Sequence, residues 1–186
     1  RKPKTLVLQL FGQLVSGSHG EAAIFSDQPI ALDTPYYVAA AFRRASDDHE
    51  GTVTFYLKDL SNDDEPLQVA EVSHQLAGGF QTQTPMRLGE VAGQTETRFD
   101  GLIDDVRLTA RPLAVEDLLY TSEKPVEGAI GYWQFESEPG LLKNSLDPGL
   151  HWNQATTETQ DSSPDFEALV DWCHLLFNSN EFLYRP

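Results

Sequence analysis

The sequence has little cysteine, few basic residues and no long apolar run. Its single cysteine, Cys173, cannot form a disulfide within the chain, so packing or a bound ion must stabilise the fold. Only 13 lysine and arginine residues stand against 29 aspartate and glutamate residues, which gives a formal net charge of −16. Such a surface repels phosphate groups, so we expect neither nucleic acid nor anionic lipid as a partner. No run of about 18 apolar residues could form a spanning helix, and we expect no membrane insertion.

Motifs for nucleophilic catalysis, phosphate binding and zinc binding are also absent. Ser18 stands beside a histidine, but neighbours on an extended chain point to opposite faces, and no Gly-x-Ser-x-Gly motif exists. The five histidines are scattered without the close pairing that is typical of zinc sites. Glu136 and Glu138 have the spacing that a glycoside hydrolase could use on a strand, but a Pro-Gly pair directly after them indicates a turn. We therefore expect no enzyme, and a glycoside hydrolase ranks last among the functions considered.

Short apolar segments separated by turn signals dominate the chain up to about residue 136. Residues 5–11 and 22–25 flank a turn rich in glycine and serine, which predicts a β-hairpin. Residues 52–58 alternate between apolar and other residues, and an acidic loop leads from them into residues 67–76, which predicts a second hairpin. The alternation puts three apolar residues on one face: Val53, Phe55 and Leu57.

One segment near the middle of the chain is the most informative. Its apolar residues do not keep one parity, since Ile103 and Val106 are three residues apart while Val106 and Leu108 are two apart. A strand that carries all of them on one buried face needs a β-bulge near Asp104. Residues 114–119 predict a short helical turn after this strand. Together with a later strand at the Trp133 region, the pattern predicts an all-β, antiparallel sandwich of about eight strands.

The glycine at 101, the acidic bulge, the strand and the helical turn resemble the closing motif of concanavalin A-like lectin/glucanase jelly-roll domains of the laminin G and pentraxin type. Residues 35–41 (Pro-Tyr-Tyr-Val-Ala-Ala-Ala) and 51–59 are similar to two earlier strands of that family, and residues 86–89 to its small strand ahead of the closing motif. The resemblance covers roughly residues 4–136. It implies a concanavalin-like antiparallel jelly-roll sandwich and a carbohydrate ligand, with calcium as a candidate cofactor.

The resemblance also places the candidate site residues. Asp104 stands where related domains hold a buried acidic residue that can coordinate calcium or hydrogen-bond the backbone at the bulge, and both alternatives stay open. Carbohydrate binding needs exposed rings on which sugar C–H groups can stack, and Tyr37 and Trp133 are the candidates. Since Tyr36 and Tyr37 lie on opposite faces of an extended strand, one of these two rings points away from the core. Packing in the core is the alternative for each candidate ring.

The C-terminal part of the chain predicts different structure. Residues 153–163 form a polar tract that we expect to be a linker, and residues 164–186 predict an amphipathic helix and tail, with Ser163 as its N-cap. The helix carries one apolar stripe: Phe166, Leu169, Val170, Cys173, Leu176 and Phe177. Such a stripe must be buried against the sandwich or a partner. The predicted organisation is therefore a sandwich over 1–152, a linker over 153–163 and a helix over 164–186.

The chain's last residues carry a second resemblance. The ending 178–184 (Asn-Ser-Asn-Glu-Phe-Leu-Tyr) resembles the C-terminal end of a planctomycete-type domain of large exported proteins that also carry cytochrome c and concanavalin-like modules. This implies that the chain is the C-terminal part of an exported multidomain protein, periplasmic or extracellular. Covalent haem attachment at Cys173 is excluded, because Val170 stands where a second cysteine is required.

One segment departs from the usual order of the laminin G-like family. Residues 131–136 (Gly-Tyr-Trp-Gln-Phe-Glu) resemble a segment that usually opens such a domain, yet here they follow the closing motif. Either the sandwich is permuted or a second copy begins at this point. The sequence predicts a non-catalytic recognition module that binds carbohydrate. The alternative is a structural or protein-interaction module that packs against other domains of the parent protein.

Overall fold

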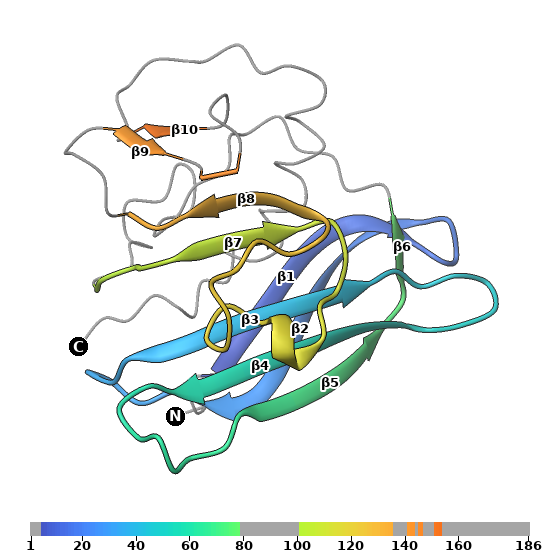
Figure 1. Ribbon diagram of the computed structural model, residues 1–186. Helices are drawn as coiled ribbons and strands as arrows, with labels where there is room; N and C mark the ends of the chain where they lie inside the picture. The colour runs from blue at the N-terminus through green and yellow to red at the C-terminus, as the bar shows by residue number, and fades with distance from the viewer. Residues whose placement is uncertain (1–4, 79–100, 136–140, 144, 147–150, 154–186) are drawn as a thin grey trace. The chain divides into compact units, whose positions relative to one another are not determined.

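A computed structural model describes residues 5–78, 101–135, 141–143, 145–146 and 151–153 of the protein. The chain divides into two compact units, with a boundary between Asp100 and Gly101. We call the part described by residues 5–78 unit 1 and the part described within residues 101–153 unit 2. The strands of both units pair in antiparallel fashion, and the described residues contain almost no helix (Figure 1). The predicted all-β class is therefore confirmed.

The first sheet of unit 1 has the strand order β2-β1-β6. Strands β1 (Thr5–Leu14) and β2 (His19–Pro29) form the first predicted hairpin, and β6 (Leu76–Gly78) pairs with the other edge of β1. The register of the hairpin shifts between Thr5 and Val7, where Asp27 on β2 has a φ of 56°. This left-handed residue produces a bulge that bends the end of β2.

The second sheet of unit 1 has the order β3-β4-β5, with β3 (Tyr36–Arg43), β4 (Gly51–Asp59) and β5 (Gln68–His74). The second predicted hairpin is therefore confirmed as β4–β5. Its predicted alternation is confirmed as well, because Val53, Phe55 and Leu57 are at most 2% exposed. Lys58 secures the loop of this hairpin, since its ammonium group donates to three carbonyl groups of residues 62–65.

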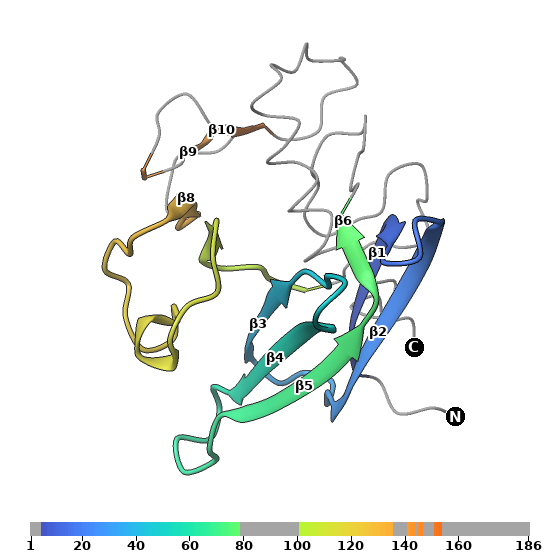
Figure 2. The same cartoon turned by 90° about the vertical axis from the view of Figure 1, so that its right-hand side faces the viewer.

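The two sheets of unit 1 pack face to face around one hydrophobic core (Figure 2). The buried residues of this core come from both sheets: Leu6, Leu8, Leu10, Ile24, Phe42, Val53, Phe55, Leu57 and Leu76. Only Gln75 separates β5 from β6, so the chain crosses at this point from one sheet to the other. Burial of so much apolar surface between two sheets is the main stabilising contribution that the described part of unit 1 contains.

Unit 2 contains two short antiparallel pairs of strands. Strand β7 (Val106–Thr109) pairs with β8 (Ala129–Trp133), and β9 (Leu141–Lys143) pairs with β10 (His151–Asn153). Between β7 and β8, the predicted helical turn is present as a 3₁₀ helix, η2 (Val115–Asp117). Asn153, which the sequence placed at the start of a linker, is the last residue of β10.

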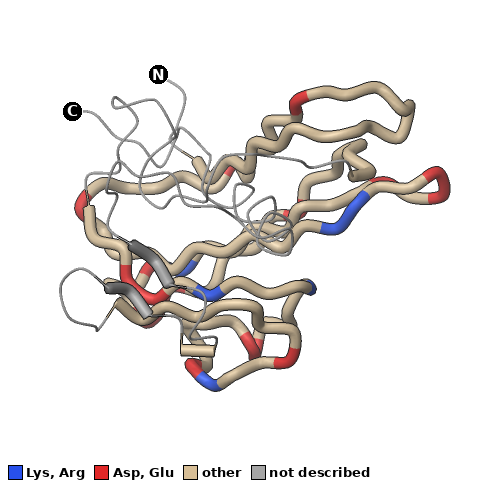
Figure 3. The backbone as a smooth tube through the Cα atoms, turned by 90° about the horizontal axis from the view of Figure 1, so that it is seen from above, with Lys and Arg blue, Asp and Glu red and all other residues tan. Residues whose placement is uncertain are grey.

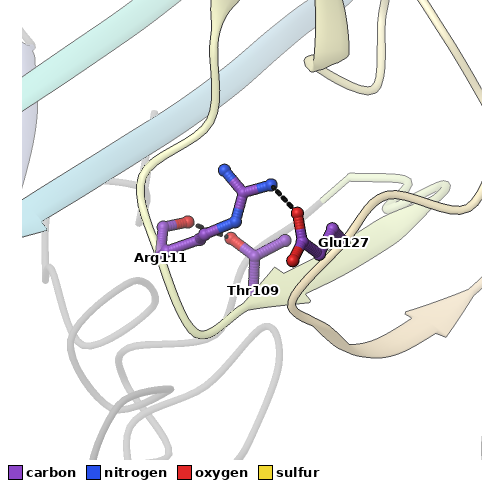
Figure 4. Close-up of polar contacts among 3 residues, drawn as sticks. All are labelled: Thr109, Arg111 and Glu127. Atoms are coloured by element: carbon purple, nitrogen blue, oxygen red, sulfur yellow. Dashed lines mark hydrogen bonds and ion pairs between the residues drawn. The ribbon is translucent and has the colours of Figure 1, made fainter.

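The ends of the loop between β7 and β8 are held together by polar contacts. The N–H group of Ala110 donates to the carbonyl of Gly128 at 2.8 Å. The Thr109 hydroxyl donates to the Arg111 carbonyl at 2.8 Å, and the Arg111 guanidinium lies 3.4 Å from the carboxylate of Glu127 (Figure 4). These contacts close the loop at its base.

The structure corrects the predicted bulged strand at Asp104. Val106 and Leu108 are 7% and 3% exposed, as predicted, but Ile103 is 37% exposed and does not share their buried face. The strand begins only at Val106, because Asp105 has a φ of 48° and interrupts the extended backbone before it. The irregularity therefore lies ahead of the strand and not within it.

Several predictions fall outside the described residues. These are the small strand at 86–89, the pair Glu136 and Glu138, the remainder of the predicted linker, and the amphipathic helix at 164–186.

Candidate ligand-binding face

The β3–β4–β5 sheet has one face turned toward the core of unit 1 and one face turned away from it. Across the second face, Tyr37 pairs with Lys58, Ala39 with Tyr56, and Ala41 with Thr54. Strand β5 adds Val69 beside Tyr56 and Glu71 beside Thr54. We call this the outer face, made of Tyr37, Ala39, Ala41, Arg43, Thr52, Thr54, Tyr56, Lys58, Val69, Glu71 and Ser73. The registers show that these side chains share one side of the sheet.

Tyr37 is the candidate ligand-binding residue that the structure places on the outer face. Its neighbour Tyr36 packs against the hydrophobic core, so the two tyrosines point to opposite faces as predicted. The Tyr37 side chain is half-buried. Ala39 and Ala41 follow Tyr37 on the same face of β3, and their short side chains project less far from the sheet than the Tyr37 ring does. The ring thus stands at one end of a row of small residues.

Tyr56 and Glu71 form the polar centre of the outer face. Burial raises the pKa of the Tyr56 hydroxyl, and the negative charge of Glu71 raises it further. This hydroxyl therefore stays protonated at neutral pH and can both donate and accept hydrogen bonds. The Thr54 hydroxyl donates to the Glu71 carboxylate at 3.4 Å. Tyr56 is only 9% exposed, so the accessible polar groups of this centre are the hydroxyl of the half-buried Thr54 and the exposed Glu71 carboxylate.

Lys58 contributes little free charge to the outer face. Its Nζ atom donates to the carbonyls of Asn62 at 2.6 Å, Asp63 at 3.4 Å and Glu65 at 2.5 Å. Three carbonyl groups of the β4–β5 loop therefore surround the ammonium group. An anionic ligand would have to compete with these contacts for the cation. Lys58 therefore offers little attraction to an anionic ligand.

Trp133, the second candidate ring, is packed within unit 2. Its side chain is 6% exposed. The indole ring lies over Gly131, because a Cβ atom at that residue would come 2.2 Å from Cη2 of the ring. A ring in this position has one face covered by its own strand, which favours the packing alternative over sugar stacking.

Asp104, the candidate calcium ligand, has an exposed side chain in unit 2. Among the residues that the structure describes, no group of three or more His, Cys, Asp or Glu side chains could hold a metal ion. The half-buried neighbour Asp105 interacts with Tyr132, whose pKa is raised by burial and then by the Asp105 charge. Calcium binding at Asp104 stays a prediction.

Sequence reasoning missed Thr54, Tyr56 and Glu71. A signal for the first two was present, because the alternation that buries Val53, Phe55 and Leu57 also turns the intervening residues to the opposite face. Glu71 could be found only from the register between β4 and β5, which pairs it with Thr54.

Comparison with protein-family models, with curated proteins and with solved structures gives no match. No helix in the described ranges is long and apolar enough to cross a membrane. Acidic residues are distributed over the strands and loops of both units (Figure 3). Evidence about function therefore comes from the geometry of the outer face.

Proposed function

We propose that the chain is a non-catalytic recognition module that binds a neutral carbohydrate on the outer face of the β3–β4–β5 sheet. One observation carries the proposal: Tyr37 and the hydrogen-bonded pair of Thr54 and Glu71 share this face, with the 9% exposed Tyr56 between them. An aromatic ring can stack on the C–H groups of a sugar, while hydroxyl and carboxylate groups can bond its hydroxyls.

The charge of the chain supports a neutral ligand. With a formal net charge of −16, the protein disfavours the approach of polyanions such as acidic polysaccharides. Of the two cations on the outer face, the Lys58 ammonium group is engaged by loop carbonyls, and the Arg43 side chain stands at the end of β3 away from Tyr37. A sugar without carboxylate, sulfate or phosphate groups meets neither obstacle.

The number of carboxylate groups on the outer face supports a role in binding and not in catalysis. Glu71 is the one carboxylate that β3, β4 and β5 place on the outer face. Glycoside hydrolysis generally needs two carboxylates flanking the scissile bond. A single carboxylate can orient a sugar hydroxyl but cannot divide the roles of acid and base or nucleophile.

We further propose a fold family for the chain and a parent protein to which it belongs. Two antiparallel sheets around one core are compatible with a concanavalin-like jelly-roll sandwich, which the sequence resemblance implies. The second resemblance supports a place in an exported multidomain protein.

A glycan array tests the proposal. We expect the chain to bind neutral glycans, and Tyr37→Ala to weaken that binding about fivefold, since aromatic contacts contribute about 1 kcal/mol. Glu71→Gln should weaken it as well, because an ionised acceptor bonds more strongly than an amide. Phe11→Ala, which alters a 63% exposed ring on the other sheet, is the matched control. Absence of neutral-glycan binding, or binding that both outer-face variants leave unchanged, contradicts the proposal.

A protein-interaction module is the second candidate, and exposed phenylalanines favour it. Phe11 and Phe25 are 63% and 41% exposed, and their register places both on the side of the β1–β2 hairpin that faces away from the core. Exposed apolar side chains on one face of a sheet are typical of contact surfaces. If this candidate is correct, Phe11→Ala weakens association with a neighbouring domain of the parent while Tyr37→Ala does not.

A further inference from the structure

His74 occupies the point where the chain passes from one sheet of unit 1 to the other. It is the last residue of β5, and β6 begins two residues later at Leu76. Leu76 is 0% exposed and belongs to the hydrophobic core. The Ala45 N–H donates to the Leu76 carbonyl, and the Val15 N–H to the Gln75 carbonyl. This corner, residues 74–76, therefore ties both sheets together.

The imidazole ring is enclosed at this corner. It stacks on the Phe42 ring with a centroid distance of 4.7 Å and an interplanar angle of 5°. Gly51 leaves the space that the ring fills, because a Cβ atom there would come 2.2 Å from Cε1 of His74. The residue is 7% exposed. Water therefore has little access to the nitrogen atoms of this ring, and an added charge on it would be costly.

The hydrogen bonds of the ring define its neutral form. Nδ1 lies 3.1 Å from the N–H group of Leu76, and it must be unprotonated to accept this bond. The proton of the neutral ring is then on Nε2, which has no hydrogen-bond partner among the described residues. Protonation would place an N–H group on Nδ1 directly opposite the Leu76 N–H group. Two donors would face each other inside the corner.

The surroundings compensate little for a positive charge on His74. Burial lowers the pKa of the ring, while the carbonyls of Thr52 and Arg43 act in the opposite direction and do not offset it. The Arg43 side chain belongs to the outer-face side of β3, opposite the side that carries Phe42. In the adjoining loop, Glu50 accepts a bond from Gln75, His49 lies against the Glu50 carbonyl, and Arg44 approaches Gly78 of β6.

We propose that His74 is an acid-sensitive latch whose protonation releases the β5–β6 corner and loosens the packing between the two sheets of unit 1. The neutral ring accepts the Leu76 N–H bond and holds the corner closed. The protonated ring loses that bond, and a buried cation favours the open corner. The latch is independent of the proposed carbohydrate binding, since His74 lies on the core side of the sheet.

The sign of the pH dependence follows from the lowered pKa. Because the folded chain binds the proton more weakly than the unfolded chain, the stabilisation is fully present above the ordinary histidine value of 6.5 and is lost as the pH falls below it. Each unit by which the pKa is lowered changes the ratio of closed to open corner about tenfold. The loss ends once the pH lies below the pKa of the folded chain.

Hydrogen exchange and histidine titration by NMR test the latch in the whole chain. We expect the Leu76 amide to exchange measurably faster at pH 5 than at pH 7, after correction for the intrinsic rate. His74→Asn keeps an acceptor near the position of Nδ1 and cannot be protonated, so it should remove this dependence. His49→Asn, at an exposed loop histidine, should retain it.

Two results overturn the proposal. One is a Leu76 amide whose corrected protection is the same at both pH values in the unaltered chain. The other is a His74 ring that titrates at or above 6.5, and this measurement needs no variant.

Discussion

The indole ring of Trp133 lies over Gly131, two residues before it on the same strand of unit 2. A Cβ atom at residue 131 would meet three ring atoms, the nearest at 2.2 Å. Leu108 of β7 pairs directly with Gly131, and it is 3% exposed. The glycine thus provides the space in which a large aromatic residue is buried on a short, two-stranded ribbon.

Gly131→Ala should therefore destabilise the protein by about 1–3 kcal/mol, because an added methyl group displaces the indole ring. Chemical denaturation followed by Trp fluorescence measures the loss. Gly20→Ala is the control, since its Cβ atom would meet Leu14 at an ordinary distance of 3.4 Å. Equal effects of the two substitutions would show that the ring does not depend on Gly131.

Arg107 should hold the loop between β7 and β8. Its guanidinium donates to the carbonyls of Ser122 at 3.1 Å, Lys124 at 3.3 Å and Asp117. We expect Arg107→Met to cost about 1–3 kcal/mol and to speed hydrogen exchange across the loop, because it leaves carbonyl groups without their charged donor.

Arg111→Met is the matched control for this loop. Its ion pair joins side chains that are 47% and 91% exposed, and an exposed pair contributes about 1 kcal/mol or less. A larger loss from Arg111→Met than from Arg107→Met would contradict the assignment.

Lys58→Met should loosen the β4–β5 loop, and the protein should still prefer a ligand without charge. The substitution removes the donor for the carbonyls of Asn62, Asp63 and Glu65 while keeping an apolar side chain of similar length. We expect faster amide exchange at residues 61–65, measured by NMR, and an unchanged preference for neutral glycans. A shift in that preference would mean that the ammonium group contacts the ligand directly.

Phe55→Ala should destabilise unit 1 far more than Val69→Ala. Phe55 is 2% exposed in the centre of the core, and removal of a buried phenylalanine ring costs about 3–5 kcal/mol. Val69 on the neighbouring strand is 54% exposed, so its truncation should cost about 0.5 kcal/mol or less. Thermal unfolding measures the stability that each variant loses. Similar losses would contradict the position of Phe55 in the centre of the core.

Strand pairing was predictable where alternation is regular. Val53, Phe55 and Leu57 recur at every second residue, so one buried face and one hairpin followed from the sequence, although Tyr56 between them is buried as well. The conformation of the segment before Val106 was not predictable. Asp105 has a left-handed backbone there and interacts with Tyr132, which is distant in the sequence. A period-two pattern assumes continuous extension and cannot detect that interruption.

The candidate site was predictable only in part. Alternation placed Tyr36 and Tyr37 on opposite faces, but only the packing of Tyr36 against the core shows which ring is turned away. The pairing of Thr54 with Glu71 depends on the register of two strands, and local sequence does not fix it. Trp133 could not be assigned from sequence, since both buried and ligand-binding aromatic residues occur on strands.

The most direct test of carbohydrate recognition on the outer face is an NMR titration of the whole chain with neutral glucan, xylan and mannan oligosaccharides. We expect at least one of them to shift the amide signals of Tyr37, Thr54, Tyr56 and Glu71 together, while those of Phe11 and Phe25 stay unchanged. Saturating oligosaccharide without any shift on these strands, or shifts confined to the β1–β2 hairpin, would contradict it.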